Sequence, residues 1–330
     1  MTDSLPMKFL SNIPKDIAWS IFVDLVNDTR IRRSWRWQCA LISKEVKAWV
    51  EPALYRCVGL YSSHKVTKFC ETIANHPSKP ANFFTNHVKT LAVGVQPSAQ
   101  EMILLLKGCT GVEALLLQFC LPPATANERI EALWAGLSPK DLCIPIAAIA
   151  KANRSFIHPI LRNATRIELL YDPILVWDWT SFRDLESVTH VSVSVQLLHR
   201  DAEPPIRRMD WLERLAKDIV PLLPVSLKVF IVSLFDLSTI AGDRPSFLQA
   251  ISEIDIRLVI GINYSPWNKW HWFIKNAVPH TLVDNQDFWE QAEAIVRRRQ
   301  QGALKWPPKP GHPHEAAILQ DLPGYPHDWE

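Results

Sequence analysis

Short runs of aliphatic and β-branched residues recur along most of this chain at a nearly constant spacing. The interval is 24 residues from Val88 to Val112. It is again 24 residues from Ala164 to Val188. Such runs predict strands, which we expect at residues 57–61, 88–93, 112–117, 142–144, 164–170, 188–193, 227–232 and 254–260. A chain with this period is expected to fold as a row of similar units.

Helix-like segments lie between these runs. Residues 64–75 place Val66, Phe69 and Ile73 on one face, and residues 100–107 and 211–223 have the same character. A strand followed by a helix, repeated every 20–29 residues or so, is the plan of a leucine-rich-repeat solenoid. We therefore expect an α/β fold with an irregular leucine-rich-repeat-like solenoid of strand–helix units over residues 57–283. The alternative is an ordinary α/β domain in which the spacing is accidental.

The first 56 residues read as a separate helical module. Ile17, Ile21 and Leu25 recur four residues apart, which predicts one apolar stripe on a helix that starts near Pro14. A second helix is expected from about residue 34 through 42. Ser43 can cap a third, which should stop before Pro52.

Residues 284–330 form a third region. Asp284 or Asn285 can cap a helix that carries Ala292 and Val296, with the basic run 297–299 in its last turn and Gly302 just beyond. From residue 306 onward, repeated prolines predict a segment without regular structure.

Composition excludes several classes of function. The 36 basic and 34 acidic side chains give a formal charge of +2, so we expect neither nucleic acid nor a membrane surface as partner. The basic and aromatic run at residues 30–37 could bind nucleic acid, but a solvated face with tryptophan anchors is the simpler interpretation. The ten glycines include no Gly-x-Gly pair, which argues against a nucleotide cofactor, and we expect no cofactor of any kind.

The cysteines and histidines do not predict a catalytic or metal site. The six cysteines are never arranged as Cys-x-x-Cys, and most lie in apolar runs, as is typical of reduced thiols in an intracellular protein of the cytoplasm or nucleus. His312 and His314 form the only close histidine pair, and no Gly-x-Ser-x-Gly motif occurs. We expect a protein that is not an enzyme, the alternative being a site assembled from dispersed residues.

Several residues of the N-terminal module and three later segments fit one known pattern. They are Ile13-Pro14, Asp16-Ile17, Ile21-Phe22, Leu25-Val26, the run 39–44 and Trp49, followed by the segments 50–58, 156–165 and 287–293. With these residues the module resembles an F-box, and the later segments resemble those of fungal F-box proteins. Val46 stands where that family usually has tryptophan.

The resemblance implies a substrate-recognition adaptor of a Skp–cullin–F-box type ubiquitin ligase. Its module would bind a Skp-type adaptor protein, and through it a cullin, while the solenoid would bind a target protein. The implied adaptor-binding residues are Ile13, Pro14, Ile17, Ile21, Phe22, Leu25, Leu41, Ile42, Val46 and Trp49. One alternative is that the stripe packs only against the chain itself, and another is a stand-alone repeat scaffold without a ligase.

Two tryptophan clusters are candidates for target binding. They comprise Trp177 and Trp179, and Trp267, Trp270 and Trp272. Tryptophan is enriched where protein interfaces bind most tightly, because it removes much apolar area from water. Filling of the core between repeats is the competing interpretation.

Overall fold

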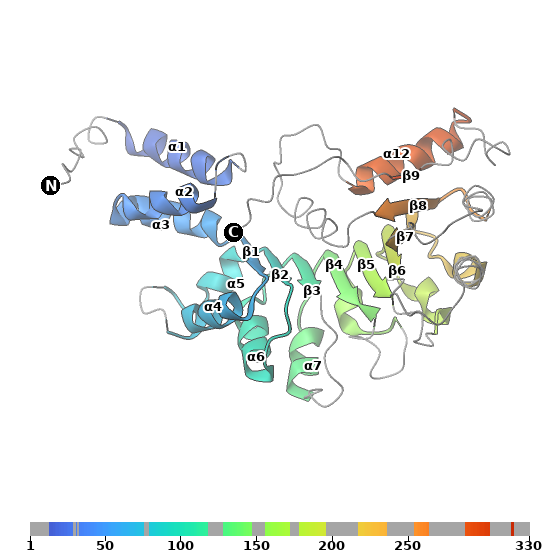
Figure 1. Cartoon of the computed structure of the whole chain (residues 1–330), viewed down its shortest axis with the longest axis horizontal. Coiled ribbons are helices and arrows are strands. Elements are labelled where there is room, and N and C mark those ends of the chain that lie inside the picture. Colours follow the sequence, from blue (N-terminus) through green and yellow to red (C-terminus); the bar gives the residue numbers. More distant parts are fainter. Residues whose placement is uncertain are drawn as a thin grey trace.

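A computed structural model describes the helical module, most of the repeats and parts of the C-terminal region. The described residues are 13–28, 31, 33–75, 79–117, 128–146, 156–171, 178–195, 217–235, 254–263, 288–303 and 318–319. The expectation of a mixed α/β chain is confirmed: a parallel sheet carries helices on its faces, and further helices precede it (Figure 1).

The helical module contains α1 (Lys15–Asn27), α2 (Arg33–Gln38), the short 3-10 helix η2 (Cys39–Leu41) and α3 (Lys44–Leu54). Ser43 caps α3 as expected, since its hydroxyl accepts a hydrogen bond from the Val46 amide at 3.1 Å. The expected end before Pro52 is wrong, because α3 continues to Leu54. A proline in the last turn costs one backbone bond, and the Tyr55 amide still closes the turn on the Glu51 carbonyl at 3.0 Å.

Among the described residues, nine strands form one parallel sheet in which each strand pairs with the next along the chain. They are β1 (Cys57–Leu60), β2 (Thr90–Val93), β3 (Ala114–Leu117), β4 (Asp141–Pro145), β5 (Arg166–Tyr171), β6 (His190–Val195), β7 (Val229–Phe235), β8 (Leu258–Asn263) and β9 (Ile318–Leu319). All eight expected strands are present. The ninth corrects the expectation for the C-terminal segment, because Ile318 and Leu319 pair with Ile260 and Gly261 of β8.

A repeated hydrogen-bond pattern precedes the strands. The Lys89 carbonyl accepts bonds from the amides of both Glu113 and Ala114, at 2.8 and 2.9 Å. The same double acceptance recurs at the carbonyls of Arg56, Glu113, Lys140, Thr165 and Thr189. Neighbouring strands are therefore joined at their starts by the same pair of hydrogen bonds.

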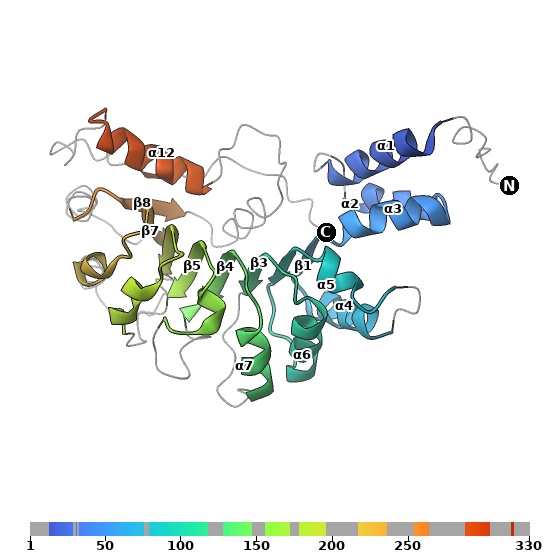
Figure 2. The ribbon, with the colours of Figure 1, turned by 180° about the vertical axis from the view of Figure 1, so that it is seen from behind.

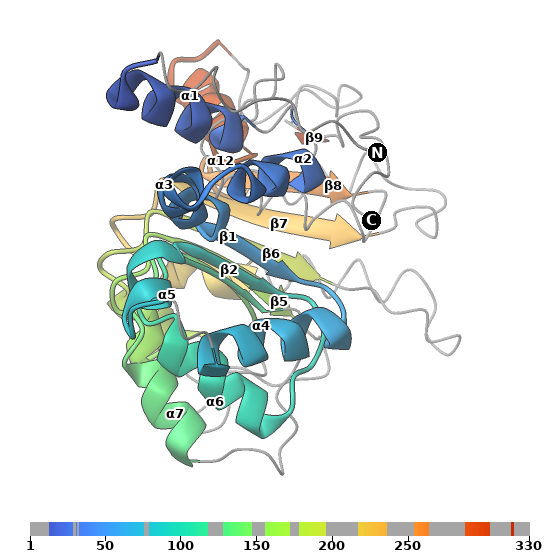
Figure 3. The same ribbon diagram turned by 90° about the vertical axis from the view of Figure 1, so that its left-hand side faces the viewer.

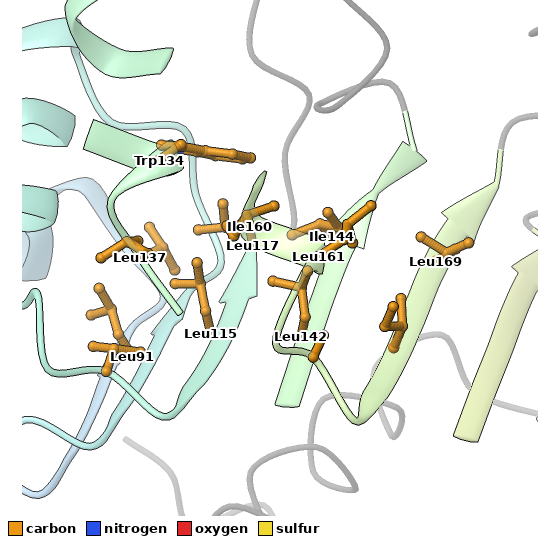
Figure 4. Packing of buried hydrophobic residues seen from close by; sticks show 14 of the residues in the cluster. Leu91, Leu115, Leu117, Trp134, Leu137, Leu142, Ile144, Ile160, Leu161 and Leu169 are labelled. Atoms are coloured by element: carbon orange, nitrogen blue, oxygen red, sulfur yellow. The ribbon is translucent and has the colours of Figure 1, made fainter. Parts of the chain in front are cut away.

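One face of the sheet carries the main core. It is covered by α4 (Ser63–Asn75), α5 (Phe83–His87), α6 (Ala99–Gly108) and α7 (Glu128–Ala135), and further along by the 3-10 helices η4 (Pro159–Leu161), η5 (Thr180–Asp184) and η6 (Val220–Leu222) (Figures 1 and 3). Figure 4 shows Leu115 and Leu142 of neighbouring strands on this side, below Trp134. Alternate strand residues are buried here because side chains of a strand point to opposite faces in turn.

The opposite face, called the second face below, is covered at its far end by α12 (Phe288–Gln300) (Figure 3). Trp289, Ala292 and Val296 of this helix pack on Val229 and Ile231 of β7 and on Val259 of β8. The expected C-terminal helix is thus confirmed, and Gly302 follows it with a φ of 69°. The helical module lies at the other end of the sheet, beyond β1 (Figure 2).

Candidate protein-interaction site

The α1 helix of the module carries an apolar stripe that no described residue covers fully. Ile17, Ile21 and Leu25 lie four residues apart and are exposed, Ile21 by 50%. Leu41 is 83% exposed, and Ile42 beside it is exposed as well. We call these five side chains the docking face. Exposed clusters of large aliphatic side chains are typical of surfaces that bind another protein.

The docking face is held in place by the small core beneath it. Val26, Cys39, Val46, Val50 and Leu54 are buried together. Lys15 of α1 pairs with Glu45 of α3 at 2.9 Å, although both side chains are exposed and the pair adds little stability. Ala18 and Val26 of α1 are buried and Phe22 packs on this core, whereas the stripe stays at the surface.

The expected adaptor-binding residues divide between surface and core. Pro14 is exposed and Ile13 half-buried, next to the docking face. Phe22 and Trp49 pack against the core of the module. Val46 is buried in that core, which corrects its assignment as a contact residue, because its side chain fills space between helices.

Two large side chains of the module were not among the expected contacts. Trp19 is 49% exposed, and Trp35 is also exposed. Trp19 lies two residues from Ile17, so it is on a different side of α1 from the stripe. Neither tryptophan falls on the four-residue spacing of the stripe, and exposure cannot be read from the sequence.

Of the expected target-binding residues, only Trp179 is among those described. Trp177, Trp267, Trp270 and Trp272 lie outside the described residues. Trp179 is buried, with its ring centroid 5.3 Å from that of Phe156 and 5.9 Å from that of Phe182. Trp179 therefore lies in the main core, not on the surface where target binding was expected.

The second face carries a polar strip that the sequence analysis did not single out. The His190 imidazole lies 2.8 Å from Glu293 of α12 and 2.8 Å from the Thr189 hydroxyl, and Ser194 donates to Glu168 at 2.8 Å. Burial lowers the pKa of His190, and Glu293 opposes that shift. The alternation of polar residues in β5 and β6 could have revealed this strip, in which His190, Ser192 and Ser194 are buried.

Two buried thiols lie in the main core, Cys70 and Cys109. Burial raises the pKa of Cys70 to about 11 and that of Cys109 to about 12, so these thiols stay protonated at neutral pH. Among the residues that the structure describes, no three His, Cys, Asp or Glu side chains are grouped so that they could hold a metal ion. Nor does any helix in the described ranges have the length and apolar character that a membrane span requires.

Comparisons with known proteins add no family. The chain matches no protein-family model, no curated protein and no solved structure.

Proposed function

We propose that this chain is a substrate-recognition adaptor of a Skp–cullin–F-box type ubiquitin ligase. The helical module binds a Skp-type adaptor protein through the docking face. The repeats form an irregular leucine-rich-repeat-like solenoid that binds a target protein, and the ubiquitin chemistry belongs to other subunits.

The observation that carries this proposal is the docking face itself. A module of α1, α2 and α3 has too little interior to bury all of its apolar side chains. It leaves Ile17, Ile21 and Leu25 exposed along one side of α1. These three residues are among those that carry the resemblance to an F-box. Aliphatic side chains presented along a helix are a common means of docking on a groove of a partner.

The arrangement of the strands supports the second half of the proposal. Every strand pairs with its neighbour in sequence, and six carbonyls before the strands repeat the same double hydrogen bond. Stacked units of this kind give an extended surface for a protein ligand. A scaffold without any ligase would have the same repeats, and only the docking face distinguishes the two functions.

The test measures binding of the full chain to a purified fungal Skp-type adaptor by titration calorimetry. The variant Ile17→Asp/Ile21→Asp places two carboxylates in an apolar contact, where each loses its hydration. A cost of at least about 3 kcal/mol corresponds to a loss of affinity of about a hundredfold or more. The control is Ser20→Asp, which adds a carboxylate to the same helix on its polar side.

The proposal predicts that wild type and Ser20→Asp bind alike, while the double variant does not bind measurably and keeps its melting temperature. If the wild-type chain fails to bind the adaptor, the ligase function is wrong and the scaffold function is favoured. If the double variant binds as wild type does, the docking face is not the contact.

A further inference from the structure

The end of α3 meets the first repeat through a cluster of aromatic rings. Tyr55, directly after α3, has its ring centroid 5.3 Å from that of Trp37 in the module. The Tyr55 centroid also lies 5.6 Å from that of Phe83 and 5.4 Å from that of Phe84, both in α5, which covers the sheet. The module and the repeats otherwise have distinct buried cores. The Tyr55 ring is therefore a contact that both share.

A buried ammonium group lies across the same junction. The Lys79 side chain is only 3% exposed, and its Nζ lies 2.8 Å from Oε2 of Glu51, which is 15% exposed. The same Nζ is 4.2 Å from the ring centroid of Phe83 and 4.8 Å from that of Tyr55. It makes no aligned hydrogen bond in the described structure, so its attraction to the carboxylate is a charge contact.

The contacts of Lys79 depend on how the helical module is oriented relative to the sheet. A buried ammonium group is costly unless a counter-charge and aromatic faces compensate its lost hydration. Glu51 belongs to α3, whereas Lys79 lies just before α5 and Phe83 is the first residue of α5. A rotation of the module relative to the sheet would move the Glu51 carboxylate away from the Lys79 ammonium, which lies against the Phe83 ring of α5. The orientation seen here keeps the counter-charge and both aromatic rings around this ammonium.

We propose that Lys79 is a positioning residue that fixes the angle between the helical module and the strand repeats. The chain then behaves as one rigid body from α1 to the sheet. This inference uses the proposed function only for its consequence: a rigid junction would hold a target at a constant distance from the adaptor bound on the docking face.

The experiment measures a distance across the junction in the full chain by pulsed electron paramagnetic resonance. Spin labels are attached to p-acetylphenylalanine introduced at Ser20 of α1 and Ala132 of α7, both exposed, so the native cysteines stay unchanged. Wild type should give one narrow distance distribution. Lys79→Met keeps the aliphatic stem but removes the charge, and should broaden the distribution or add a second distance.

Two further variants make the result decisive. Lys68→Met removes an exposed cation from its 3.3 Å pair with Glu71 within α4, and should leave the distribution as narrow as in wild type. Glu51→Gln removes the counter-charge with little change in shape and should broaden the distribution as Lys79→Met does, which keeps the test valid if Lys79→Met fails to fold. Distributions as narrow as wild type in both junction variants would overturn the proposal.

The failure of this inference can be told apart from failure of the proposed function. Lys79→Met leaves the docking face intact, so its affinity for the Skp-type adaptor should equal that of wild type. Absence of adaptor binding in wild type would refute the ligase function but would not alter the distance measurement.

Discussion

The Trp179 indole lies among aromatic rings of the main core, although the neighbouring Asp178 is exposed. The Asp178 carboxylate accepts bonds from the Thr180 amide at 2.9 Å and from the Thr180 hydroxyl at 2.6 Å. This turn starts η5 and directs Trp179 toward Phe156 and Phe182. A count of tryptophans in a short segment cannot reveal such a direction, because it depends on a local side-chain-to-backbone bond and on rings distant in sequence.

At the scale of this residue, Trp179→Ala should lower the free energy of unfolding by about 3–5 kcal/mol, as large-to-small changes in a packed aromatic core do. Urea unfolding followed by circular dichroism measures the change. The matched control is Trp19→Ala, which truncates a half-exposed tryptophan and should cost much less. Equal, small losses in both variants would mean that Trp179 is not part of the core.

At the scale of elements, periodicity predicted the existence of strands and helices better than their ends. The strand expected from residue 88 starts at Thr90, because the amides of Lys89 and Thr90 both bond to the Arg56 carbonyl of the preceding unit. Four-residue spacing likewise identified the exposed stripe of α1. The spacing could not distinguish Val46, which fills the module core, from the exposed contact residues. Nor could it find Lys79, whose partners come from α3 and α5.

The attachment of α12 depends on a buried arginine within the basic run expected in its last turn. The Arg299 guanidinium donates to the carbonyls of Ile256 and Leu258, and burial lowers its pKa to about 10, so it remains charged at neutral pH. Arg297 and Arg298 are exposed. Arg299 therefore attaches α12 to the residues just before and at the start of β8. The helix-dipole interaction expected for this basic run does not explain that contact.

At this scale, Arg299→Met should loosen α12, because two buried carbonyls lose their donor. Hydrogen exchange measured by mass spectrometry should become faster in residues 288–300 than in the rest of the chain. Arg298→Met, which removes an exposed charge from the same turn, should leave exchange unchanged. Equal protection of α12 in both variants would show that apolar packing on β7 and β8 alone holds this helix.

At the scale of the whole molecule, the described residues form a module core, a main core under the strands, smaller buried clusters on the second face, and a junction between module and sheet. The module core includes Val26 and Val50, and the main core runs under the strands from Val58 to Ile260. Because each strand pairs only with its sequence neighbours, removal of one end exposes a single interface rather than dividing the sheet. At the end next to the module, the contacts of Tyr55 and Lys79 contribute to the packing of this interface.

Deletion of residues 1–52 should therefore give a fragment that folds cooperatively but is less stable than the full chain. The fragment keeps Tyr55 but loses Trp37 and Glu51, so one side of the Tyr55 ring becomes exposed while the Lys79 ammonium regains contact with water. A loss of about 1–2 kcal/mol corresponds to a decrease in melting temperature of about 2–4 °C for a fragment of this size. Calorimetry of the fragment should show one sharp transition in that range. A broad transition would contradict separate cores, because it would mean that the strand repeats cannot pack without the helices that precede them.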